Sequence, residues 1–127
     1  PETLDGLVSL HFDGNKLYDA GQNIPVTTEF LQGGSKVTIE FLERCENQKL
    51  IWSPLQTHFV RNTQHKKFNL TFYDAGPNGN GGHYLRTRIY DNENRLTGWN
   101  VNSFMIRGFE TENITYSNSE KCLRPEY

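Results

Sequence analysis

Cysteine, methionine and long apolar runs are all scarce in this sequence. Its 127 residues include only 2 cysteines and 1 methionine. No stretch approaches the roughly 20 consecutive apolar residues that a membrane-spanning helix requires, so we expect no membrane span. The cysteines, Cys45 and Cys122, lie far apart and outside any Cys-x-x-Cys pair. This isolation argues against zinc and redox sites.

The sequence also lacks an excess of charge of either sign. Lys and Arg total 13 and Asp and Glu total 15, which gives a formal net charge of −2. Nucleic acids and anionic membranes are bound through concentrated basic surface. The densest basic cluster here is only His65-Lys66-Lys67. We therefore expect no nucleic-acid partner.

Recognisable catalytic motifs are absent. The sequence contains neither a Gly-x-Ser-x-Gly elbow nor a His-Glu-x-x-His pair, and its 4 histidines are spread along the chain. A small nuclease or glycosidase would need to assemble its acid and base from His83, Glu40 and Arg86, and nothing in their spacing brings them together. We expect a non-catalytic chain and keep a small hydrolase as the minor alternative.

Aromatic residues, in contrast, are plentiful. The chain has 8 Phe, 6 Tyr and 2 Trp, and aromatics make up 13% of it. Because each aromatic ring buries a large area, these residues offset a modest hydrophobic content of 35%. A disordered chain would be poor in aromatics. We expect a single domain that spans residues 1–127, long enough to bury a real core.

Alternation of apolar and polar residues with a period of two is the main secondary-structure signal. It predicts strands at 7–12, 24–31, 36–42, 50–52, 57–61, 68–73, 84–90, 99–107 and 113–116, and the irregular stretch 42–49 is compatible with a helical turn. Turn residues separate these eight or nine short strands, which recur about every ten residues. No run alternates a strand with a long helix. The pattern predicts an all-β fold, an antiparallel two-sheet sandwich or jelly roll.

The segment 84–90 has two different faces. One face carries the apolar side of the alternation, and the other carries Tyr84, Arg86, Arg88 and Tyr90. Tyr and Arg are enriched at recognition surfaces, since a Tyr ring covers large area and Arg offers directed donors to hydroxyls and carboxylates. The structural alternative is that Arg stems lie on Tyr rings and stabilise the sheet without any ligand.

A loop rich in Gly and Asn, residues 74–82, precedes this segment and is expected to join it to 68–73 in one hairpin. The predicted ligand-binding residues lie on this hairpin and at its rim: Tyr73, Asn78, Asn80, Tyr84, Arg86, Arg88, Tyr90 and Trp99. We expect no cofactor. A calcium ion held near Asp74, Asn78 and Asn80 is the alternative, because oxygen ligands suit calcium, although their spacing matches no calcium motif.

The two cysteines leave two readings open, a disulfide or two unrelated thiols. We favour a Cys45–Cys122 disulfide, since the cysteine count is even and no metal spacing is present. A bridge across so long a loop is worth about 4 kcal/mol at most in the chain-entropy model. Abundant Asn, Gly and Thr suit a secreted chain. The glycosylation patterns at Asn69 and Asn113 permit secretion without demonstrating it.

Together these observations predict a secreted, non-catalytic recognition module for a carbohydrate or glycoprotein. It would bind through the Tyr/Arg face and the Asn/Gly-rich loop. The alternative is a protein–protein interaction module, such as a host-interaction or adhesion factor. Small carbohydrate-binding sandwiches share this general look, but a shared fold does not fix a function.

Overall fold

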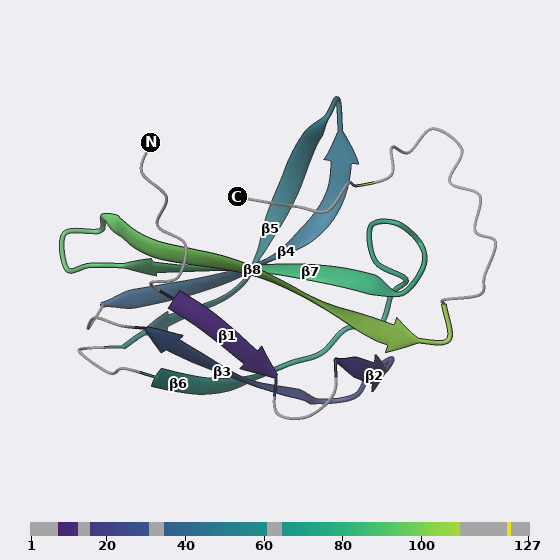
Figure 1. Ribbon diagram of the computed structural model, residues 1–127, viewed down its shortest axis with the longest axis horizontal. Coiled ribbons are helices and arrows are strands. Elements are labelled where there is room, and N and C mark those ends of the chain that lie inside the picture. Colours follow the sequence, from purple (N-terminus) through teal and green to yellow (C-terminus); the bar gives the residue numbers. More distant parts are fainter. Residues whose placement is uncertain (1–7, 13–15, 31–34, 61–64, 110–121, 123–127) are drawn as a thin grey trace.

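The computed structural model describes residues 8–12, 16–30, 35–60, 65–109 and 122. These residues contain eight strands and no helix: β1 (Val8–Phe12), β2 (Leu17–Asp19), β3 (Ile24–Phe30), β4 (Lys36–Glu46), β5 (Lys49–Phe59), β6 (His65–Leu70), β7 (Gly82–Tyr90) and β8 (Leu96–Arg107). A three-stranded sheet has the order β1-β3-β6, and a five-stranded sheet has the order β2-β8-β7-β4-β5. Figure 1 shows the two sheets as layers. The all-β sandwich predicted from the sequence is confirmed.

β5 is one continuous strand, where the sequence predicted two short ones. Ser53 and Pro54 were expected to interrupt it, yet the pairing with β4 runs from Lys36 opposite Phe59 to Glu46 opposite Lys49. β5 lies at the edge of its sheet, and the register shifts close to Pro54. Proline has no N–H to donate, so an edge strand beside a bulge tolerates it.

The helical turn considered for residues 42–49 is wrong. β4 continues to Glu46, and a two-residue turn at Asn47 and Gln48 leads directly into β5. Both turn residues have positive φ, 51° and 64°. This is the conformation of a two-residue hairpin turn whose twist matches that of the strands. The β4–β5 hairpin projects beyond the rest of the sheet in Figure 1.

The predicted hairpin 68–90 is also wrong. β6 belongs to the three-stranded sheet and β7 to the five-stranded sheet, so the intervening loop crosses between layers. Short β2 was not predicted, because three residues carry too little alternation. It pairs in parallel with the end of β8. The strand predicted at 113–116 lies outside the described residues.

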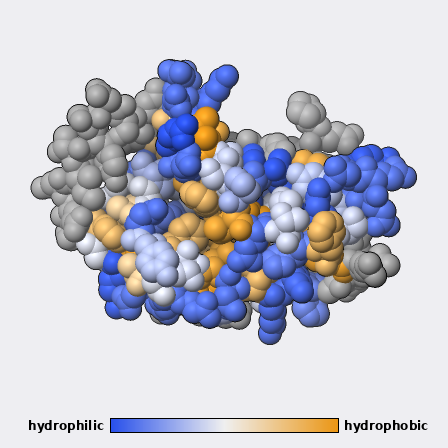
Figure 2. All heavy atoms as spheres, turned by 180° about the vertical axis from the view of Figure 1, so that it is seen from behind, coloured by the Kyte–Doolittle hydropathy of each residue, from blue (hydrophilic) through white to orange (hydrophobic). Residues whose placement is uncertain are grey.

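The core fills the space between the sheets. Its larger cluster includes Phe72 and Phe104, whose ring centroids lie 5.1 Å apart, and a smaller cluster joins Val8, Val37, Val60 and Ile89. Burying an aliphatic or aromatic side chain contributes about 1.5–3 kcal/mol. Seen from behind, apolar side chains reach the surface across the middle of the molecule, between polar ones (Figure 2).

A disulfide joins Cys45, near the β4–β5 hairpin tip, to Cys122, as predicted. The two Cα atoms are 5.4 Å apart, within the normal range for a disulfide. Asn78, in the loop between β6 and β7, also holds the backbone of Cys122: its Oδ1 accepts from Cys122 N at 2.6 Å, and its Nδ2 donates to Cys122 O at 3.1 Å. Three segments distant in sequence therefore meet at one end of the sandwich.

The same loop depends on glycine at Gly76. Its φ is 75°, and a Cβ atom there would collide with the carbonyl group of Gly82. The described residues include no helix long and apolar enough to cross a membrane.

Candidate ligand-binding face of the five-stranded sheet

Burial alternates along β7 from Gly82 to Tyr90, as the sequence predicted. His83, Leu85, Thr87 and Ile89 are buried against the three-stranded sheet, while the residues between them are half-buried on the opposite side. We call that opposite side of β4, β5, β7 and β8 the outer face.

The register sets the neighbours on the outer face. Arg86 lies between Glu40 of β4 and Val101 of β8, Arg88 between Thr38 and Trp99, and Tyr90 between Lys36 and Leu96. On β5, Phe59 is opposite Lys36, and Trp52 is opposite Leu42. Residues from four strands thus form in-register rows across one surface.

A carboxylate shared by two guanidinium groups lies at the centre of the outer face. Arg86 binds Glu40 through two hydrogen bonds, Nε to Oε1 at 3.1 Å and Nη2 to Oε2 at 2.8 Å. Arg88 reaches Glu40 through Nη2, 2.7 Å from Oε1. The side chain of Glu40 is 12% exposed, against 13% for Arg86 and 24% for Arg88. The Glu40 carboxylate therefore pairs with both arginine side chains, and all three groups are mostly shielded from water.

Aromatic rings flank this ion cluster on both sides. The guanidinium carbon of Arg86 lies 4.8 Å from the ring centroid of Trp52. Tyr90 is close to two cations, with Lys36 Nζ at 4.5 Å and Arg88 Cζ at 5.7 Å from its ring centroid. Such contacts contribute roughly 0.5–2 kcal/mol each and hold the rings in place. Arg86 is thus held within the sheet by Glu40 and the Trp52 ring.

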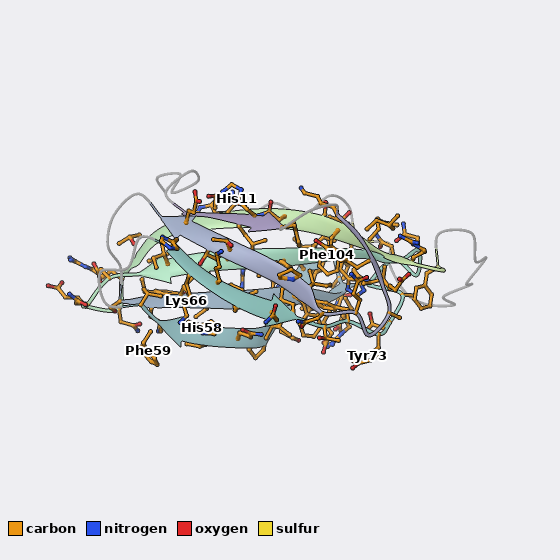
Figure 3. All side chains as sticks on the ribbon, turned by 90° about the horizontal axis from the view of Figure 1, so that it is seen from below. His11, His58, Phe59, Lys66, Tyr73 and Phe104 are labelled. Carbon is orange, nitrogen blue, oxygen red and sulfur yellow. A yellow bond between two sulfur atoms is a disulfide. The ribbon has the colours of Figure 1, made fainter. Side chains whose placement is uncertain are left out.

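The remaining predicted site residues are divided between this face and other parts of the molecule. Trp99 lies on the outer face beside Arg88. Tyr73 does not: it is 73% exposed, and its ring lies against Gly21 in the turn before β3. Figure 3 shows Tyr73 and Phe59 projecting at opposite ends of the sandwich. Tyr73 is therefore separated from the Tyr/Arg face.

The polar side chains of the loop 74–82 form hydrogen bonds within the chain. Asn78 binds Cys122, as described above, and Asn80 Oδ1 accepts from Gly82 N at 3.0 Å. Asp74 Oδ1 accepts from Gly76 N at 3.1 Å. Among the described residues, no group of three or more His, Cys, Asp or Glu is placed to hold a metal. These bonds shape the loop, and calcium binding there stays a prediction.

His83 is separated from the two residues with which a hydrolase would need it to act. It is 2% exposed on the inner side of β7, stacked on Phe104, with Nε2 3.0 Å from the backbone oxygen of Asp74. Glu40 and Arg86 project from the opposite side of the sheet. Burial lowers the pKa of His83, an effect larger than the opposing influence of Asp74. The three residues do not form one site.

Lys36 and Phe59 belong to the outer face but were not among the sequence-predicted site residues. Phe59 is 75% exposed on an edge strand. Each shares the alternation of its own strand, which was visible in the sequence. The sequence did not reveal the pairing that sets Lys36 beside Tyr90 and Phe59 beside Lys36, because register between distant strands depends on the whole sheet.

No protein-family model and no curated protein matches the chain. Solved structures do resemble it. The sulfur carrier protein SoxY from Chlorobium limicola f thiosulfatophilum aligns with a TM-score of 0.54 and 10% identity, over 80% of this chain and 77% of that one. A chitin binding domain from Burkholderia pseudomallei aligns with a TM-score of 0.51 and 8% identity, over 73% of this chain and 57% of that one. At such identities the likeness shows the fold alone.

Proposed function

We propose that this chain is a non-catalytic recognition module that binds a carbohydrate on the outer face of its five-stranded sheet. The observation that carries the proposal is the grouping of rings around the Glu40 ion cluster. Trp52, Tyr90 and Trp99 come from three different strands and lie beside the two arginines on one surface.

The chemistry of this face suits a sugar. A pyranose ring has an apolar C–H side, which stacks on an aromatic ring, and a rim of hydroxyl groups, which bind planar donors and acceptors. The Arg86–Glu40 pair and the Trp52 contact fix those groups before any ligand arrives. A fixed surface loses less conformational entropy on binding.

The comparisons are compatible with a binding module, since one of the similar solved structures is a chitin binding domain. Chitin oligosaccharides therefore belong in the first ligand panel. The disulfide supports a secreted location, because such bridges persist in oxidising compartments.

A protein-interaction module is the second candidate. It is favoured by Phe59, a large apolar side chain that is 75% exposed on the edge strand β5. An exposed aromatic beside an unpaired strand edge is a common feature of surfaces that bind peptides or proteins.

The proposal is tested by titrating a panel of soluble oligosaccharides, including chitin oligomers, into the folded protein in a calorimeter. We expect Tyr90→Ala to weaken binding of the best ligand roughly fivefold or more, since truncating an aromatic ring that contacts the ligand costs at least about 1 kcal/mol. Tyr73→Ala is the matched control, because Tyr73 is more exposed yet lies off the outer face.

Two outcomes would count against the proposal. One is the absence of binding to any saccharide in the panel. The other is an equal loss of affinity in Tyr90→Ala and Tyr73→Ala, which would place the ligand elsewhere. Mass spectrometry of the same mixtures checks the non-catalytic part, because shortened oligosaccharides would show turnover.

A further inference from the structure

We propose that the carbohydrate bound by the outer face is acidic, and that Lys36 and Arg88, beside the Tyr90 ring, bind its carboxylate or sulfate group. This inference rests on the proposed function and names its ligand class. It is based on which charged side chains lie on this face and on which of them form ion pairs.

The charge of the outer face is opposite in sign to that of the whole chain. Where β4 and β7 pair, the described outer face carries three cations, Lys36, Arg86 and Arg88, and one carboxylate, Glu40. The local net charge is therefore +2, whereas the chain has a formal net charge of −2. A local excess of this kind attracts anionic ligands and disfavours cationic ones.

The excess positive charge belongs to Arg88 more than to Arg86, because Glu40 pairs more fully with Arg86. Glu40 binds Arg86 through two hydrogen bonds but meets Arg88 through Nη2 alone. The Nε atom of Arg88 has no acceptor in the described part of the chain. Arg88 is also about twice as exposed as Arg86, 24% against 13%. The Nε atom is itself buried, so a ligand would meet the exposed part of the guanidinium, which suits a second carboxylate or a sulfate.

Lys36 supplies the second cation of this subsite. Its Nζ donates to the neutral side chain of Asn94 at 2.6 Å and lies over the Tyr90 ring. None of the ion pairs formed by the described residues includes Lys36. Asp91 and Glu93, the acids of the adjoining turn, both pair with Arg95. The Lys36 ammonium group, which forms no ion pair among the described residues, can therefore bind an anionic ligand.

A saccharide that carries both a ring and an acid group matches this arrangement. The acid group would lie at Lys36 and Arg88, and the sugar ring would lie along the adjacent aromatic side chains. A neutral sugar would cover the Lys36 ammonium group without supplying a counter-ion, which costs binding energy.

The test compares pairs of ligands, each with an acidic member and a neutral member built on the same sugar chain. One pair is an oligogalacturonate and its methyl ester, and the other is a sulfated isomaltooligosaccharide and its unsulfated parent. We expect the acidic member of at least one pair to bind roughly tenfold more tightly than its neutral partner at low salt, with the difference shrinking as NaCl rises. The pair that shows the preference identifies which acid group is bound.

Lys36→Gln is the test variant, and Lys66→Gln on β6 of the other sheet is its control (Figure 3). We expect Lys36→Gln to lose most of the preference for the acidic ligand, because it should weaken binding of the acidic member of the pair more than that of the neutral member. Lys66→Gln should keep the preference. Arg88→Gln is expected to act like Lys36→Gln, and urea unfolding checks that each variant is folded.

The outcomes separate this inference from the proposed function. If neutral saccharides bind as tightly as acidic ones, the acidic ligand class is wrong and the carbohydrate function stands. If no saccharide of either kind binds, the proposed function itself is wrong. An equal loss in Lys36→Gln and Lys66→Gln would mean that the attraction is non-specific and that the assigned subsite is wrong.

Discussion

At two places in the described part of the molecule, a carboxylate lies beside a buried or half-buried basic side chain. The two places differ in which of the partners is buried. On the outer face, Glu40 and its two arginines are all mostly covered and lie in contact with one another. At the start of β7, only the base is covered: His83 is 2% exposed, whereas its partner Asp74 is 76% exposed.

This difference shows what burial does to each kind of group. Arginine stays protonated at any ordinary pH, so burying it requires a counter-charge. Histidine can lose its proton instead, and burial lowers the pKa of His83 despite the nearby carboxylate. The outer face therefore presents charged side chains to a ligand, whereas burial next to Phe104 favours the neutral form of His83.

Among the variants that test this comparison, Glu40→Gln is expected to change the free energy of unfolding most. Removing the carboxylate takes the shared counter-charge away from two mostly covered guanidinium groups, which should lower the free energy of unfolding by about 3 kcal/mol. Urea denaturation measures it. Glu29→Gln is the matched control, since Glu29 is 60% exposed and lies 3.5 Å from His11 in a surface pair. Its effect should stay within about 0.5 kcal/mol. Equal effects would show that the Glu40 cluster is no stronger than a surface ion pair.

The second expected effect is a loss of stability in mild acid that depends on His83. Because the folded pKa of His83 is lowered, its contribution is full above the unfolded pKa of about 6.5. As the pH falls below that value, the unfolded chain binds a proton that the folded chain does not, so stability declines until the folded pKa is reached. His58, whose pKa burial also lowers, contributes in the same direction.

Urea unfolding between pH 7 and 5 measures this decline. His83→Phe keeps an aromatic ring next to Phe72 and Phe104 but cannot titrate, so its stability should fall less over that range. His11→Phe is the control, because His11 is exposed on β1. A decline as steep in His83→Phe as in the parent would show that other groups cause the acid sensitivity.

The sequence predicted the parts of this comparison that depend on local pattern. Alternation along 84–90 gave the two faces of β7, and the isolated pair of cysteines pointed to the disulfide. Both follow from chemistry within one segment or from a simple count. The fold class followed in the same way, from the spacing of short strands and turns.

Contacts between distant strands were not predictable. Glu40 and Arg86 are 46 residues apart, and their pairing depends on β4 and β7 meeting in one register. The hairpin at Asn47 and Gln48 lacked the glycine that usually marks such a turn, so the segment was interpreted as a helical turn. The assumed β6–β7 hairpin failed because the loop between these strands crosses layers, which no local residue preference reveals.

The smallest expected effect concerns Asp74, and it tests whether the exposed partner still influences the buried one. Asp74 raises the pKa of His83 through its backbone oxygen and its charge. Asp74→Asn keeps an oxygen that accepts from Gly76 N but removes the charge, so the pKa of His83 should move further down. Titration of the His83 ring signals by NMR measures this shift, with Asp19→Asn, an exposed site paired with Arg107, as control. An unchanged His83 pKa in Asp74→Asn would mean that water screens the carboxylate completely, and that burial and the backbone oxygen alone set the state of the histidine.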